Sequence, residues 1–343
     1  MITQLRSVAI VFGAVFTFTY LSCKTKDGTK TNDSKDSIPA VKSPVQNSVP
    51  TFDSALYREK LKYMAIGDTT GKWPVNDPTP LQGAIFPFNR VVAYYGNFFS
   101  KKMGVLGEYE KDTVLSMLKR ECERWSKADS LLPVIPALHY VAITAQGSPG
   151  KDGKYRLRMP FAQIDTLVNM AKKINALTFV DIQVGFSTLQ AEIPTLEQYL
   201  LQPQMHLGID PEFSMKQGNV PGTRIGTFDA ADINYAIDYL ASLVKKNNLP
   251  PKILVVHRFT QGMLTNYQNI KLVPEVQVVI DMDGWGPKIL KRSTWDRYLV
   301  KEPVQFTGFK LFYKNDTKTG ADQIFSPEEL SKYWPKPVYI QYQ

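Results

Sequence analysis

Acidic residues stand at the ends of several apolar segments of this chain, and their types and spacing are suited to acid–base catalysis. The segments LTFVDIQVG and VQVVIDMDGWG each carry aspartate at the end of a continuous apolar run, and HLGIDPEF contains both Asp210 and Glu212. Adjacent carboxylates repel each other, so at least one should hold a proton near neutral pH. A protonated carboxyl group beside an ionised one is the pair that glycoside hydrolysis requires.

The two-residue period of a β-strand indicates which of these side chains share a face. Asp181 shares a face with Gln183, and Asp281 shares one with Asp283. The mixed face of polar and small residues is expected to point into a barrel, while the purely aliphatic face meets the helices. Barrel enzymes carry their chemistry on inward polar residues at the carboxyl ends of strands.

The sequence therefore predicts one site built from strand ends. Its candidate catalytic residues are Glu212, Asp210, Asp181 and Asp281. Its candidate substrate-binding residues are Tyr95, Asn97, Gln183, His257, Arg258, Asp283, Trp285 and Lys310. Glu212 is the expected proton donor, because crowded carboxyl groups in a partly dry pocket keep a proton available near neutral pH. Aromatic residues in the same loops, such as Trp285, are suited to stacking on pyranose rings.

The Asp210-Pro-Glu212 step is similar to the Asp-x-Glu found at the fourth strand of lysozymes of glycoside hydrolase family 25. The resemblance covers these two residues and, loosely, the acids after the third and sixth strands. It implies that Glu212 is the general acid and that Asp210 or Asp281 stabilises or orients the substrate. The wider set of segments, including VVAYYGN, HRFTQGM and DMDGWG, resembles an exported bacterial family.

Several of these residues also have a structural interpretation. Asp181 and Lys310 could form a buried ion pair that closes the barrel. Asp283 precedes a glycine, so its whole role could be to form a turn. Arg258 could form a structural contact with a carboxylate. His206 stands early in its segment and is interpreted as a core histidine rather than a site residue.

Two other functions compete with the hydrolase interpretation. A divalent-metal-dependent hydrolase would need ligands at strand ends, but the chain has only three histidines and no H-x-H or H-E-x-x-H pair. No metal or other cofactor is therefore predicted, although an all-oxygen Mg²⁺ or Ca²⁺ site stays open. The non-enzyme alternative is a glycan-binding protein on a degenerate barrel. A nucleophilic serine is not expected, because no G-x-S-x-G occurs.

The elements that must position these residues alternate regularly along the chain. Eight apolar segments are expected to be strands: 90–95, 136–145, 177–184, 205–209, 252–256, 277–281, 307–312 and 338–342. Helical patterns are expected at 112–127, 160–174, 193–201, 230–246, 288–297 and 327–333. This alternation and its length predict a single (β/α)₈ barrel of the α/β class. An open doubly wound sheet is the alternative, but no glycine-rich phosphate loop follows any of the segments.

The amino-terminal segment predicts export. Residues 1–22 combine Arg6 with a short apolar stretch and end with Leu21-Ser22, directly before Cys23. This pattern resembles a bacterial lipoprotein signal with lipid attached to Cys23. An ordinary secretory signal and an uncleaved anchor are the alternatives. Residues 23–51 are mostly polar and are expected to form a flexible tether, which leaves 52–343 for the barrel domain. The expected location is the cell envelope, periplasmic or surface-exposed.

The chain is basic, but the distribution of its basic residues does not indicate a nucleic-acid partner. The formal net charge is +9 and the isoelectric point is about 9.2. Basic pairs such as Lys101-Lys102 and Lys291-Arg292 are scattered, and no basic stripe interleaved with aromatic residues indicates nucleic-acid binding. The expected partners are a polysaccharide or other glycan and the membrane, the latter through Cys23. A monomer is expected, and Cys122 is interpreted as a packed helix residue.

Overall fold

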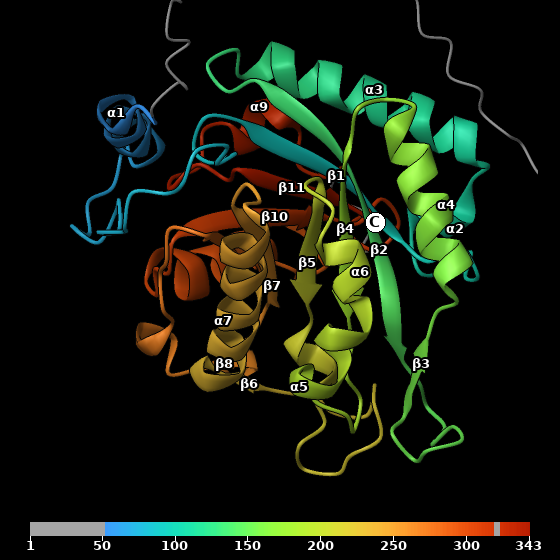
Figure 1. Cartoon of the computed structure of the whole chain (residues 1–343). Coiled ribbons are helices and arrows are strands. Elements are labelled where there is room, and N and C mark those ends of the chain that lie inside the picture. Colours follow the sequence, from blue (N-terminus) through green and yellow to red (C-terminus); the bar gives the residue numbers. More distant parts are fainter. Residues whose placement is uncertain (1–51, 319–322) are drawn as a thin grey trace, which may run out of the picture. The chain divides into compact units, whose positions relative to one another are not determined.

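A computed structural model describes residues 52–318 and 323–343, so the predicted signal, Cys23 and the whole of the predicted tether lie outside the described residues. Eight strands form a closed parallel barrel, in the neighbour order β1-β11-β10-β9-β7-β5-β4-β2, and β2 pairs back with β1 (Figure 1). The strands are β1 (Arg90–Gly96), β2 (Val134–Ala145), β4 (Leu177–Ile182), β5 (Met205–Ile209), β7 (Lys252–Arg258), β9 (Val276–Met282), β10 (Phe306–Leu311) and β11 (Tyr339–Tyr342). The (β/α)₈ fold and all eight predicted strands are confirmed.

Helices follow the strands on the outside of the barrel (Figure 1). They include α3 (Lys111–Ala128), α4 (Phe161–Lys172), α5 (Leu189–Glu192), α6 (Glu197–Leu200), α7 (Ala230–Asn247), α8 (Lys288–Thr294) and α9 (Pro327–Leu330), with a π-helical turn at Trp295–Val300. Asp229 and Ser326 cap α7 and α9 with reciprocal side-chain bonds, as their residue types predict. Pro160 directly precedes α4. No helix among the described residues is both long and apolar enough to cross a membrane.

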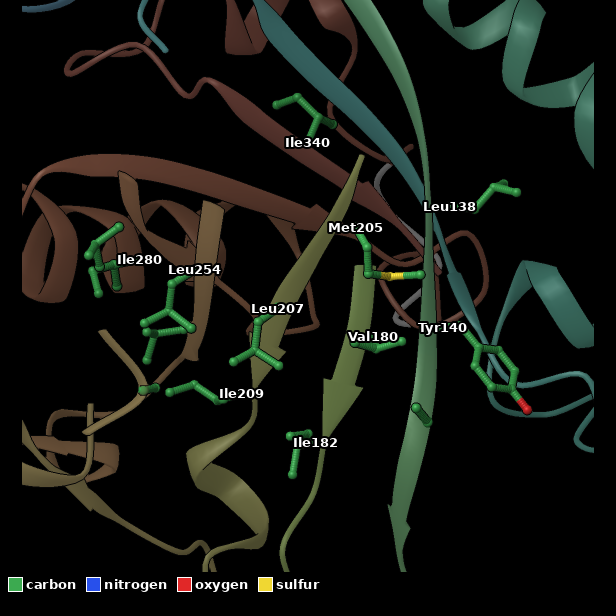
Figure 2. Close-up of a cluster of buried hydrophobic side chains, with 14 of the residues drawn as sticks. Leu138, Tyr140, Val180, Ile182, Met205, Leu207, Ile209, Leu254, Ile280 and Ile340 are labelled. Carbon is green, nitrogen blue, oxygen red and sulfur yellow. The ribbon is translucent and has the colours of Figure 1, made fainter. Parts of the chain in front are cut away.

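The strand side chains divide into two faces, as the sequence pattern predicts. The outward aliphatic side chains pack against the helices, and Figure 2 shows members such as Leu207, Leu254 and Ile280. The inward residues Phe179 and Val255 belong to a second apolar cluster inside the barrel. Inward polar residues follow them two positions later on the same strands, so the barrel interior changes from apolar to polar toward its carboxyl end.

The amino-terminal end of the barrel is closed by a segment that the sequence pattern did not reveal. Helix α1 (Ser54–Met64) buries Tyr57, Leu61 and Met64 in the same cluster as Phe179 and Val255. The side-chain amide of Gln277 holds the following segment by accepting from the backbone of Ile85 and Phe86 and donating 2.7 Å to the Phe86 carbonyl. This apolar plug leaves the carboxyl end as the open end of the barrel.

Shorter elements shape that open end. Strand β3 (Arg156–Arg158) pairs antiparallel with the end of β2, and β6 (Phe228–Asp229) pairs with β8 (Leu264–Thr265). Helix α2 (Val105–Glu108) follows β1, and 3₁₀ turns occur at Pro211–Phe213, Ile193–Leu196, Gln261–Met263 and Tyr267–Asn269. All except the turn at 193–196 fall in segments where the sequence predicts neither helix nor strand.

Candidate active site

A cavity of about 590 Å³ opens at the carboxyl ends of the strands, and we call it the cleft. Its polar lining includes Tyr95, Gln183, Asp210, Glu212, Asp283 and Lys310, and its apolar lining includes Met103, Phe213, Phe259, Trp285, Leu290 and Phe312. The volume and the mixed lining are typical of small-molecule sites. These six polar residues and Trp285 were all predicted as catalytic or substrate-binding residues, and they converge on one cavity.

Asp210 and Glu212 are positioned by the turn that ends β5. Asp210 caps the 3₁₀ turn Pro211–Phe213, because its Oδ1 accepts from the Glu212 backbone N–H at 3.1 Å. Its Oδ2 accepts from Gln183 Nε2 at 3.2 Å. The proline between the two acids starts the turn, and both acids line the cleft.

The environment of this pair favours protonation. Burial and the neighbouring Asp210 and Asp283 carboxylates raise the pKa of Glu212 to about 8. Burial also raises the pKa of Asp210 to about 7, although the positive charge of His257 opposes this shift. A proton donor near neutral pH is thus available on Glu212, as the crowding of acids in the sequence predicts.

Asp283 is the ionised carboxylate of the cleft. It follows β9, and its Oδ1 lies 3.0 Å from Lys310 Nζ while its Oδ2 lies 3.1 Å from His257 Nδ1. Burial alone would raise the pKa of Asp283, but these two cationic neighbours lower it below its ordinary value. Asp283 is therefore more than a turn residue, and the alternative ion pair between Asp181 and Lys310 was wrong, because Lys310 is paired with Asp283 instead.

Lys310 is fixed from two sides. Its ammonium group lies 3.9 Å from the centroid of the Tyr95 ring, a cation–π contact, and 5.2 Å from that of Phe312. The Tyr95 hydroxyl in turn donates to Asp181 Oδ2 at 3.0 Å. The lysine is thus held at the floor of the cleft by strands β1, β9 and β10.

Beneath the cleft lies a fully buried layer that we call the polar floor, made of His139, Asp181, His257 and Asp281. His257 lies between three carboxylates: its Nε2 is 3.5 Å from Asp181 Oδ2, and its Nδ1 is 3.4 Å from Asp281 Oδ2 and 3.1 Å from Asp283 Oδ2. His139 Nε2 is 3.8 Å from Asp181 Oδ1. The predicted catalytic residues Asp181 and Asp281 therefore lie below the cleft and do not line it.

Charge and burial compete in the polar floor. Burial alone would raise the pKa of Asp181, but His257 and His139 hold it well below its ordinary value. Burial would lower the pKa of His257, but the Asp181 and Asp283 carboxylates raise it well above the usual range. Burial lowers the pKa of His139 to about 4 and raises that of Asp281. The layer thus keeps Asp181 ionised in the interior of the barrel.

Two predicted substrate-binding residues have structural contacts outside the cleft. Arg258 is buried, ion-paired with Glu302, and donates to the Tyr298 carbonyl at 3.1 Å, which is the structural interpretation given to it above. Asn97 donates to the Val141 carbonyl at 2.9 Å and accepts from Phe99 N–H at 2.9 Å, so it shapes the loop after β1.

Other residues of the site differ in how well the sequence revealed them. Trp285 is 55% exposed at the cleft, and His206 is the core histidine that was expected, accepting from the Ile253 N–H at 3.0 Å. His139 was missed, although its place two residues after Ala137 puts it on the inward face of β2. Tyr339, whose hydroxyl lies 2.6 Å from His139 Nδ1, was missed as well.

The arrangement brings a protonatable carboxyl group, an ionised carboxylate and a buried ammonium group to one cavity with aromatic walls. Such a site can donate a proton to a leaving oxygen and stabilise positive charge on the other side of the cleaved bond. In comparisons with known proteins, no family model matches this sequence and no curated protein is significantly similar to it.

Proposed function

We propose that the barrel domain is a glycoside hydrolase in which Glu212 is the general acid. The observation that carries the proposal is the shared cleft: Glu212, Asp210 and Asp283 line one cavity at the carboxyl end of a (β/α)₈ barrel, beside aromatic side chains. The pKa of Glu212, raised to about 8 by burial and by Asp210 and Asp283, supports a proton donor at neutral pH. The resemblance of Asp210-Pro-Glu212 to family 25 lysozymes agrees with this role.

In the proposed reaction, the proton of Glu212 moves to the glycosidic oxygen while the bond from that oxygen to the anomeric carbon breaks. A water molecule supplies the hydroxyl group that the anomeric carbon gains, and its other proton restores the carboxyl pair. The positive charge that develops on the sugar faces Asp283, whose ion pair with Lys310 at 3.0 Å keeps it ionised. Asp210 is the alternative partner carboxylate, because it also lines the cleft.

Asp181 and Asp281 are assigned a positioning role in this proposal. Both are fully buried in the polar floor and contact His257, which in turn contacts Asp283. They orient the imidazole without reaching the substrate. Trp285, Phe213 and Phe259 offer the apolar faces on which sugar rings stack.

We also propose that the domain is exported and anchored to the membrane by lipid on Cys23, where it acts on an envelope or environmental polysaccharide. The support is the lipoprotein-like signal and the polar segment after it. Replacing Cys23 by alanine should leave the protein without lipid and shift it out of the membrane fraction. Unchanged membrane partition without signal cleavage would rule the anchor out.

The hydrolase proposal is tested by reducing-end release from peptidoglycan and common polysaccharides. We expect the wild-type protein to release reducing ends and Glu212→Gln to lose about 10²- to 10⁴-fold in rate. Glu59→Gln, an exposed change in α1, is the matched control and should keep full activity. If the wild-type protein binds oligosaccharides but cleaves none of these substrates, the domain is a glycan-binding module and the proposal fails.

A further inference from the structure

Unpartnered polar atoms mark the polar floor. Within the described part of the chain, five buried atoms have no partner in hydrogen-bonding geometry: His139 Nε2, both ring nitrogens of His257 and both carboxylate oxygens of Asp281. All three residues are fully buried. Buried polar groups in folded proteins are nearly always hydrogen-bonded or bound to an ion. This concentration of orphaned nitrogen and oxygen atoms points to a ligand.

The distances identify the kind of ligand. His139 Nε2 lies 3.8 Å from Asp181 Oδ1 and His257 Nε2 lies 3.5 Å from Asp181 Oδ2. Both are too long for hydrogen bonds. Two ligand atoms on a tetrahedral zinc ion, each about 2.1 Å from the metal, are separated by about 3.4 Å. One ligand atom from each of the three residues lies within 4.8 Å of the others, so a small inward rotation of the imidazoles reaches that spacing.

The opposite nitrogen of each imidazole lies close to an oxygen atom, although the contact of His257 Nδ1 lacks hydrogen-bonding geometry. His257 Nδ1 lies 3.1 Å from Asp283 Oδ2, and His139 Nδ1 lies 2.6 Å from the Tyr339 hydroxyl. Metal-binding histidines typically use one nitrogen for the ion and give the other to a carboxylate or another oxygen, which sets the tautomer and the ring orientation. Both rings therefore direct Nε2 toward Asp181 with this supporting pattern in place.

Gly208 leaves room beside these atoms. It is paired in register with Asp181 across β4 and β5. A methyl carbon added at position 208 would clash with His139 Nε2 and would lie 2.6 Å from Asp181 Oδ1. Any larger side chain would thus fill the space between the histidine and the aspartate, and glycine keeps it accessible.

The chemistry of the three candidate ligands favours a transition-metal ion at this position. Two imidazoles and one carboxylate form a ligand set that suits zinc and related transition metals, whereas Mg²⁺ and Ca²⁺ prefer oxygen ligands alone.

We propose that His139, Asp181 and His257 bind one divalent transition-metal ion of the zinc class beneath the cleft. The sequence predicted no metal because it holds no short histidine motif; here the ligands come from three separate strands, β2, β4 and β7. The ion would hold His257 against Asp283 and so fix the cleft floor. This site is independent of the proposed hydrolase reaction, since metal binding is measured without any substrate.

Isothermal titration of the chelator-stripped protein with zinc chloride tests the proposal. We expect one equivalent of zinc to bind with a Kd below about 1 μM and to raise the melting temperature, because a ligand that binds only the folded state stabilises it. His139→Gln and Asp181→Asn should each weaken binding by about 100-fold or more. A variant with Cys23→Ser and Cys122→Ser is the matched control and should bind zinc as the wild type does, and so should Glu212→Gln.

Four outcomes would overturn the site. If the stripped wild-type protein binds no zinc, the polar floor is instead balanced by a protonated His257. Binding that survives His139→Gln, or that is lost with the two cysteines, would place the ion elsewhere. If the ligand variants do not fold, the wild-type protein loaded with cobalt(II) decides: a visible spectrum of nitrogen and oxygen ligands supports the site, and thiolate charge-transfer bands refute it.

Discussion

Lys310 and Asp283 form an ion pair in which Nζ lies 3.0 Å from Oδ1 and both side chains are nearly fully buried, at 4% and 7% exposure. They come from the ends of neighbouring strands β10 and β9, where parallel strands bring their carboxyl ends to one edge. The Lys310 ammonium group also lies 3.9 Å from the centroid of the Tyr95 ring. Two residues that lie 27 positions apart in the sequence thus form the charged centre of the cleft.

Replacing Lys310 by methionine should be strongly destabilising. The change keeps most of the side-chain volume but leaves the buried Asp283 carboxylate without its closest cation. Breaking a buried pair in this way costs about 3–5 kcal/mol in the free energy of unfolding. Urea denaturation of the purified variant measures this loss.

The matched control for this variant is Lys314→Met. Lys314 stands just beyond β10 and is ion-paired with Glu108, but its side chain is 67% exposed. Exposed pairs contribute about 0–1 kcal/mol, so this variant should melt like the wild-type protein. Equal losses for the two variants would show that the Lys310 pair is no stronger than a surface contact.

Replacing Asp210 by asparagine should move the alkaline limb of the pH–activity profile to lower pH. Burial, Asp210 and Asp283 raise the pKa of Glu212 to about 8, while Lys310 and His257 oppose the shift. Removing the Asp210 charge lowers that pKa, so Glu212 loses its proton at a lower pH. The amide can still accept from the Glu212 backbone N–H, as Asp210 does at 3.1 Å.

The profile of kcat/KM against pH measures this shift, because its limbs report the acid and base of the free enzyme. The wild-type alkaline limb is expected near pH 8, where Glu212 titrates. An unchanged limb, or one at higher pH, would show that Glu212 is not the group whose proton loss ends activity.

The fold was predictable because its signals are local and repeated. Each buried strand is a continuous apolar run, and the helices between them carry caps such as Asp229 and Ser326 that can be recognised from residue type and spacing. The segment around α1 was not predicted, because Tyr57, Leu61 and Met64 become buried only against the end of a barrel formed from distant strands. Local periodicity carries no information about such a plug.

The sequence was enough to predict on which face of its strand a site residue lies, but not which residue it contacts. Strand period placed Asp181 and Asp281 inward, but it could not show that they lie one layer below the cleft lining. His139 escaped notice because a single histidine within an apolar strand resembles a core residue. An ion pair between Lys310 and Asp181 was one alternative interpretation of the sequence, whereas the stagger of the barrel brings Lys310 to Asp283.

Deleting the last seven residues, 337–343, should prevent soluble folding. Strand β11 pairs with β1 on one side and with β10 on the other. Its loss opens the barrel and leaves two unpaired strand edges, which favour aggregation. Circular dichroism of the soluble fraction should show no cooperative melting, and a stable two-state truncation would contradict closure. Tyr342→Phe is the control: it removes only the hydrogen bond from Trp125 Nε1 at 3.0 Å and should cost about 1 kcal/mol.

Glu212→Gln should change how stability depends on pH. The folded-state pKa of Glu212 is about 8, above its ordinary value of 4.5, because of burial and of Asp210 and Asp283, with Lys310 and His257 opposing. A carboxyl group with a raised folded-state pKa contributes stability that is present below its unfolded pKa and is lost as pH rises through the folded value. Glutamine stays neutral and has no such loss.

The variant and the wild-type protein should therefore unfold with similar free energies at pH 4, below the unfolded pKa of 4.5, and the variant should be more stable at pH 8.5. The expected difference is on the order of 1–3 kcal/mol, reduced by the partial exposure of the side chain. Urea denaturation at several pH values measures it, and Glu59→Gln, exposed on α1, should keep the wild-type trend. A variant that is several kcal/mol less stable at pH 8.5 would mean that the Glu212 carboxylate is half of a stabilising pair. A carboxylate held in that way has no proton to donate, so the same measurement tests whether Glu212 can act as the acid.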